Sequence, residues 1–130
     1  MNLTFIGAGS MAEALFSSFL RENYVKPVQI FITNHSNDQR LEQLQQHYGV
    51  STSRNRKEIV QNADVIFIAT LPQQAEEIAK EIAPWVKEDA VIISILAGVS
   101  IQTLEQFLPK QSIARLMPNT PAQIGLGACG

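Results

Sequence analysis

The sequence predicts an α/β protein with a doubly wound parallel sheet of six strands, in one domain spanning residues 1–130. Two observations support this fold class. Six short apolar runs alternate with segments of helical period along the chain, and the first run ends in a glycine-rich turn that opens a helix. Parallel strands joined by right-handed crossovers then give the strand order 3-2-1-4-5-6. With 130 residues, 45% of them hydrophobic, the chain can bury a core without disulfides.

The first strand and the turn after it carry the clearest functional signal. Leu3–Ile6 is short and apolar or β-branched, and Gly7–Ala12 matches the pattern G-x-G-x-x-(G/A). Gly7 permits a tight turn, Gly9 has no Cβ to obstruct a pyrophosphate, and Ala12 lets the helix lie close to the sheet. The free N–H groups of the first helical turn then face the phosphates. A Rossmann-type dinucleotide site is therefore expected, with a purely structural glycine turn as the alternative.

The remaining elements follow from apolar runs and helical periodicity. Strands are expected at Val28–Thr33, Val50–Ser53, Ala63–Ala69, Ala90–Ile95 and Ser112–Met117. Helices are expected at Met11–Arg21, Asp38–His47 (ended by Gly49), from Arg54, and at Gln73–Ile82 and Ile101–Leu108. In this strand order ligands bind where strands 1 and 4 end. The segments expected at that crevice are Gly7–Ala12, Thr70–Gln73, Ala97–Gly98 and Pro118–Thr120.

The end of the second strand bears on the choice of cofactor. NAD enzymes usually place Asp or Glu there to bind the ribose 2′-hydroxyl, and that carboxylate would repel a 2′-phosphate. Here Thr33–Asn37 is neutral and rich in donors, and Arg40 follows one turn later. Asp38, the nearby acid, is interpreted as the residue that caps the next helix. The pattern favours NADP, with NAD still possible. His35 is either a ligand or a solvated loop residue.

Two further patterns have competing interpretations. The basic run from Arg54 to Lys57 is either a solvated face or a neighbour of the adenosine end of a cofactor, and Trp85 is expected to be a packing residue. The net charge of −2 argues against a nucleic-acid partner, and the lone Cys129 argues against a disulfide framework and a metal site. No apolar run approaches the ~20 residues that span a membrane, so a cytoplasmic protein is expected.

Four stretches together resemble the N-terminal domain of the pyrroline-5-carboxylate reductase family. They are Phe5–Ala12, Ala63–Gln73, Ser94–Val99 and Arg115–Pro121 with Gly125 and Gly127. The run R-x-M-P-N-T-P at Arg115–Pro121 is the most specific of them. The resemblance implies hydride transfer from NADPH to the C=N bond of 1-pyrroline-5-carboxylate, a small imine, giving L-proline.

The resemblance also implies roles for individual residues. Gly7, Gly9, Ser10 and Met11 would hold the pyrophosphate, while Asn34, His35 and Ser36 would take the adenosine ribose or its phosphate, with Asn55 nearby. The nicotinamide end would be contacted by Ala69, Thr70, Leu71 and Pro72, with Ala97 at the same crevice, and edged by Met117, Pro118 and Asn119. No catalytic residue is assigned within this chain.

Two departures from the family pattern leave alternatives open. Leu71 stands where the family usually has a lysine, which removes a positive charge near the cofactor. Family members continue into a helical dimerisation domain that supplies much of the substrate pocket. These 130 residues are therefore expected to bind a nucleotide and to reduce little or nothing on their own, whereas the complete chain is expected to be a homo-oligomer.

The main alternative is a non-catalytic NADP(H)-binding sensor or regulatory paralogue. The cofactor domains of deazaflavin-linked NADP oxidoreductases and of hydroxyacid dehydrogenases begin in a similar way. These domains lack the M-P-N-T-P run, so they rank last among the functional interpretations of this sequence.

Overall fold

A computed structural model describes residues 1–34, 37–95, 101–108 and 112–115 of the chain. The strands are β1 (Leu3–Ile6), β2 (Ile30–Thr33), β3 (Ser51–Thr52), β4 (Val65–Ile68), β5 (Val91–Ser94) and β6 (Ser112–Arg115). The α-helices are α1 (Ser10–Arg21), α2 (Asp38–Tyr48), α3 (Arg56–Gln61), α4 (Ala75–Ile82) and α5 (Ile101–Glu105). Two 3₁₀ turns, η1 (Pro27–Gln29) and η2 (Pro72–Gln74), precede β2 and α4.

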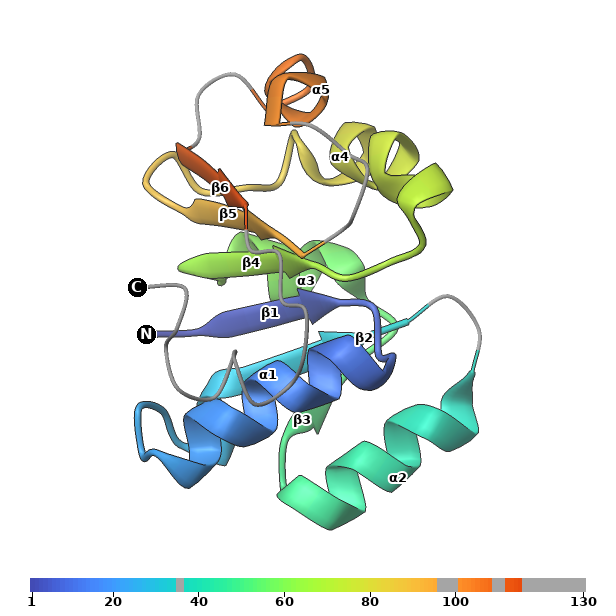
Figure 1. Cartoon of the computed structure of the whole chain (residues 1–130), viewed down its shortest axis with the longest axis vertical. Helices are drawn as coiled ribbons and strands as arrows, with labels where there is room; N and C mark the ends of the chain where they lie inside the picture. Colours follow the sequence, from blue (N-terminus) through green and yellow to red (C-terminus); the bar gives the residue numbers. More distant parts are fainter. Residues whose placement is uncertain (35–36, 96–100, 109–111, 116–130) are drawn as a thin grey trace.

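All six strands are parallel and lie in the order β3-β2-β1-β4-β5-β6, which confirms the predicted topology (Figure 1). The four central strands end level with one another, because Ile6 pairs with both Thr33 and Ile68, and Ile68 pairs with Ser94. The strand order changes direction between β1 and β4. In an open sheet of this kind the ligand crevice lies at that switch point, beyond the carboxyl ends of the strands.

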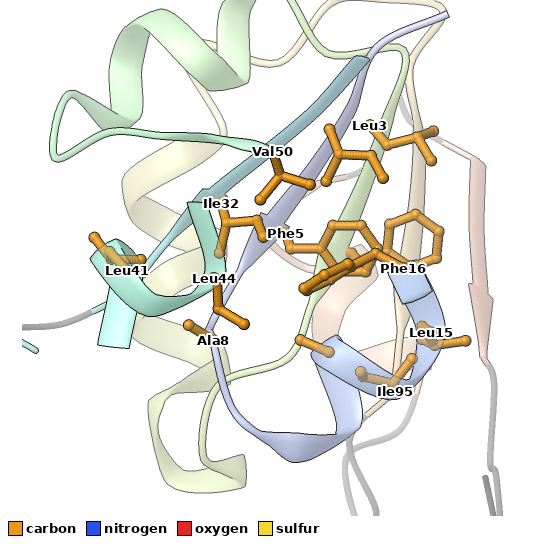
Figure 2. Close-up of a cluster of buried hydrophobic side chains, with 13 residues drawn as sticks. Leu3, Phe5, Ala8, Leu15, Phe16, Ile32, Leu41, Leu44, Val50 and Ile95 are labelled. Carbon is orange, nitrogen blue, oxygen red and sulfur yellow. The ribbon is translucent and has the colours of Figure 1, made fainter. Parts of the chain in front are cut away.

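Each face of the sheet buries its own apolar cluster. On one face, β1, β2 and β4 pack against α1 and α2, and the ring of Phe5 stacks on Phe67 with centroids 4.4 Å apart (Figure 2). On the other face, Ile6, Ile66 and Ile92 pack against side chains from α3, α4 and α5. Alternate residues of one strand therefore enter opposite clusters. In Figure 1, α1 lies in front of the sheet and α3 behind it.

Several element boundaries differ from the sequence expectation. Val28 lies in η1 and is 69% exposed, since Pro27 starts a 3₁₀ turn whose Gln29 side chain accepts a hydrogen bond from the Lys26 N–H at 2.8 Å. The second strand accordingly starts at Ile30. The third strand is only Ser51–Thr52, and the helix expected from Gln73 begins as the η2 turn.

The residue that caps α2 was also predicted incorrectly. Asn37 is the N-cap, and its side-chain oxygen accepts a hydrogen bond from the Arg40 backbone N–H at 3.0 Å. Asp38 lies in the first turn of the helix, where its charge still favours the helix dipole. At the other end of α2, Gly49 adopts the expected left-handed conformation, with φ of 76°. No helix of the described ranges is long and apolar enough to cross a membrane.

Candidate functional site

Gly7 is required by the geometry of the sheet. Its φ is +120°, and a Cβ at this position would lie 2.3 Å from the carbonyl oxygen of Ala69, at the end of β4. Its N–H donates a hydrogen bond to the Thr33 carbonyl oxygen at 2.8 Å, at the end of β2. The glycine therefore lets the turn after β1 press against the ends of both neighbouring strands. This need is structural and does not depend on a ligand.

Gly9 is in a different situation. Its φ of −81° suits any residue, and a Cβ built on it would meet nothing within 4 Å. It is the N-cap of α1 and no side chain caps that helix, whose first backbone hydrogen bond runs from the Glu13 N–H to the Gly9 carbonyl oxygen at 3.1 Å. The first-turn N–H groups that precede this bond have no partner within the helix. This arrangement fits an anionic group such as a pyrophosphate.

A cleft of about 850 Å³ lies over this turn, at the carboxyl ends of β1, β2 and β4. Eight of the residues predicted to bind a cofactor line it, namely Gly7, Gly9, Ser10, Met11, Asn34, Ala69, Thr70 and Leu71. Leu71 is 58% exposed at this cleft. Pro72 lies in η2, directly after these residues. The fold thus brings together residues from three separate segments that were assigned to one bound dinucleotide.

The other predicted site residues are placed differently. His35, Ser36, Ala97, Met117, Pro118 and Asn119 lie outside the described residues. Asn55 does not line the main cleft. It is the N-cap of α3, where its side-chain oxygen accepts a hydrogen bond from the Glu58 backbone N–H at 3.2 Å.

A second hollow, of about 360 Å³, adjoins the main cleft. It is lined by Asn34, Arg54, Asn55, Arg56, Lys57, Glu81 and Trp85. Asn34 and Arg56 line both spaces, so the two hollows meet at the end of β2. Trp85 also packs on the apolar cluster below, consistent with its predicted packing role. The basic run from Arg54 to Lys57 therefore lies beside the cleft.

Arg40, which follows the donor-rich end of β2 by one helical turn, has its partners in the glycine turn and in α1. Its Nε donates to the Ala8 carbonyl oxygen at 2.8 Å, inside the glycine turn, and its Nη2 lies 2.6 Å from Glu13 Oε1. The Tyr48 hydroxyl donates to the other Glu13 oxygen at 2.5 Å. Arg40 still lines the cleft. The arrangement ties the turn to both α1 and α2.

This network shifts the pKa of two of its members. The hydrogen bond from Tyr48, followed by that from Arg40, lowers the pKa of Glu13 below its usual 4.5. Burial, and then the hydrogen bond to Glu13, raise the pKa of Tyr48 to about 12. Glu13 is therefore a carboxylate and Tyr48 a neutral donor at neutral pH. Nothing in the sequence signalled this network, since Glu13 lies in the first turn of α1 whereas Arg40 and Tyr48 lie at opposite ends of α2.

Comparison with known proteins gives the chain a family. Residues 2–98 match the family described as NADP oxidoreductase, coenzyme F420-dependent. The chain belongs to this family. Pyrroline-5-carboxylate reductase 2 of Bacillus subtilis (strain 168) is 41% identical over 127 residues, which cover 97% of this chain and 45% of that protein.

One solved structure supports the same relationship, and a second shows the same fold. A pyrroline-5-carboxylate reductase from Coxiella burnetii is 33% identical, with a TM-score of 0.83 over 95% of this chain and 46% of that one. A Plasmodium falciparum pyrroline carboxylate reductase with NADP bound shares the fold at 24% identity, with a TM-score of 0.79 over 98% of this chain and 45% of that one. These comparisons confirm the predicted resemblance to the N-terminal domain of the reductases. The chain spans about half the length of the curated relatives that it matches.

Proposed function

We propose that this chain is the NADP(H)-binding domain of a pyrroline-5-carboxylate reductase-like oxidoreductase. The observation that carries the proposal is the open space over Gly9, at the bottom of a cleft where the ends of β1, β2 and β4 meet. This space lies where a dinucleotide pyrophosphate binds in such sheets. The family match to residues 2–98 supports the same conclusion.

Three groups of residues in the cleft would contact three parts of the dinucleotide. Gly9, Ser10 and Met11 would face the pyrophosphate with backbone N–H groups. Asn34 would take the adenosine ribose, because it directly follows β2. Ala69 to Pro72 would lie at the nicotinamide end. When bound, NADPH supplies the hydride from C4 of its nicotinamide ring, and the protein positions and shields that carbon.

We assign the imine 1-pyrroline-5-carboxylate as the substrate and L-proline as the product. The similarity to reductases of this name extends over 97% to 100% of the chain, whereas the broader family match ends at residue 98. The longer similarity therefore includes Arg115–Pro121, the run that separates these reductases from related cofactor domains. We also propose that the complete enzyme is a homo-oligomer in the cytoplasm, where NADPH is available.

A non-catalytic NADP(H) sensor or regulatory paralogue is the second candidate. Leu71 favours it, because a side chain that is 58% exposed at the cleft contributes no charge where the family usually has a lysine. Such a protein would bind the nucleotide without turnover.

A chimera separates the two candidates. This chain would replace the matching part of the Bacillus subtilis relative, and NADPH oxidation would be followed with 1-pyrroline-5-carboxylate. Turnover would support the reductase. A folded chimera that binds NADPH but does not oxidise it with the imine would favour the sensor. The matched control carries Gly9→Val, which should stay folded and lose nucleotide binding, because its side chain fills the open space.

A further inference from the structure

Arg54 connects the end of β2 to the start of α2. Its Nη1 donates to the backbone oxygen of Asn34 at 2.5 Å and to the side-chain oxygen at 2.6 Å. Its other edge faces Asp38, because Nε donates to Oδ1 at 2.8 Å and Nη2 donates to the same oxygen at 2.5 Å. The guanidinium therefore lies at the residue where the two hollows meet.

The edge of the guanidinium that Asp38 occupies is the one that suits a phosphate. Two parallel N–H groups on one edge bind carboxylates and phosphates in the same bidentate manner. The pair is exposed, with 38% of the Arg54 side chain and 84% of the Asp38 side chain accessible. Exposed pairs of this kind contribute little to stability, so a more highly charged anion can replace the carboxylate.

The surrounding charge also favours an anion. The hollow beyond Asn34 is lined by three basic side chains, Arg54, Arg56 and Lys57, and by one acidic side chain, Glu81. Arg56 is paired with Glu81 at 2.6 Å. The excess positive charge lies next to the position of the adenosine ribose in this fold.

We propose that Arg54 binds the 2′-phosphate of NADP(H), and that Asp38 competes with this phosphate for the same guanidinium edge. Arg54 is then a specificity-determining residue, and Asp38 limits the preference for NADP(H) over NAD(H). This inference rests on the proposed nucleotide binding. It assigns opposite effects to the two members of one ion pair, which a purely structural pair would not show.

The test measures the affinity of the 130-residue chain for NADP⁺ and NAD⁺ by calorimetry, and for 2′,5′-ADP and 5′-AMP, which isolate the 2′-phosphate. In Arg54→Gln the affinity for NADP⁺ and 2′,5′-ADP should fall about tenfold or more, with NAD⁺ and 5′-AMP unchanged, because a charged hydrogen-bond pair is lost. In Asp38→Asn the affinity for the two 2′-phosphorylated ligands should rise severalfold at low salt, and the gain should shrink at high salt. Arg21→Gln, at the end of α1, is the charge-matched control and should change neither ratio.

The outcomes separate this inference from the proposed function. If the unmodified chain binds neither nucleotide, the proposed function fails and the inference fails with it. If the chain binds NADP⁺ but Arg54→Gln lowers the affinity for all four ligands alike, or for none of them, Arg54 does not bind the 2′-phosphate. In that case only the inference is overturned. A loss of NADP⁺ affinity in Asp38→Asn would overturn the proposal that Asp38 competes with the phosphate. An unchanged affinity for NAD⁺ shows that each variant is folded.

Discussion

The two glycines of the turn after β1 should respond in opposite ways to the same substitution. In Gly7→Ala the new methyl carbon would lie 2.3 Å from the Ala69 carbonyl oxygen, 2.5 Å from the Ala69 carbonyl carbon and 3.0 Å from the Thr70 nitrogen, at a φ of +120°. All three contacts are to backbone, so the strand ends must move apart. Backbone strain of about 1–3 kcal/mol and overpacking of about 1–3 kcal/mol together lower the free energy of unfolding by about 2–6 kcal/mol.

The size of this loss is measurable by urea or thermal unfolding. For a chain of this length about 2–6 kcal/mol corresponds to a decrease in Tm of roughly 8–24 °C. Gly9→Ala adds the same methyl group at a φ of −81°, where nothing lies within 4 Å. Its free energy of unfolding should fall by only about 1 kcal/mol, the typical cost of placing Ala at an N-cap.

Ligand titration supplies the other half of the comparison. The methyl group of Gly9→Ala occupies the space assigned to the pyrophosphate, so the affinity for NADP⁺ should fall by about tenfold or more in a fully folded protein. Equal stability of Gly7→Ala and the unmodified chain would refute the steric reasoning. Unchanged NADP⁺ affinity in Gly9→Ala would refute the placement of the pyrophosphate.

The network around Glu13 leads to four further predictions. Tyr48→Phe removes a hydrogen bond to a carboxylate and should lower the free energy of unfolding, measured in urea, by about 1–2 kcal/mol. The control Tyr24→Phe changes a side chain that is 72% exposed and should alter this free energy by less than about 0.5 kcal/mol. Because the folded pKa of Tyr48 is raised from 10.0 to about 12, the stability due to its neutral form is complete below pH 10 and is lost as the pH rises toward 12, and Tyr48→Phe should remove this alkaline decrease. On the acid side, the lowered pKa of Glu13 gives stability that is present above pH 4.5 and is lost as the pH falls further. In a plot of the free energy of unfolding against pH, Glu13→Gln should therefore show a flatter decrease at acid pH. An unaltered decrease would argue against the network. Finally, Arg40→Lys keeps the charge but has no planar group that can bind Ala8 and Glu13 together. Calorimetry should therefore show that the affinities for NADP⁺ and NAD⁺ fall by similar factors. A loss of affinity restricted to NADP⁺ would contradict this positioning role.

The sheet could be predicted from sequence because its four central strands are short runs of mainly apolar residues. The order of the strands followed from the alternation with helices and from the handedness of the crossovers. The boundaries were less accurate where polar side chains decide them. Val28 is apolar but lies in a 3₁₀ turn, because Pro27 and the Gln29 side chain fix the backbone there.

The candidate site was likewise predicted well in its backbone positions and poorly in its polar side-chain contacts. The glycine turn and Thr70 were placed at one crevice because strand ends meet at the switch point, and the cleft contains both. Asn34, which the family resemblance assigned to the adenosine ribose, lines the same cleft. The partners of Arg40, Asp38 and Arg54 could not be inferred, since long polar side chains choose among several neighbours only once the helices are packed. Both Asp38 and Arg40 were assigned roles from their sequence positions, and the structure gives each a partner more than 15 residues away in the chain.

The division of the apolar residues between the two faces of the sheet also has a consequence for how the chain folds. Of the buried residues in the first cluster, all but Phe67 and Ile95 come from residues 3–50, and all of those in the second except Ile6 come from residues 60–108. The first half of the chain can therefore cover its own face of the sheet as soon as it leaves the ribosome, and β1 then serves as the template on which β4 assembles. Until the second half is made, the edge of β1 that pairs with β4 and the side chain of Ile6 stay uncovered, so the exposed apolar surface of the half-made sheet is concentrated at β1.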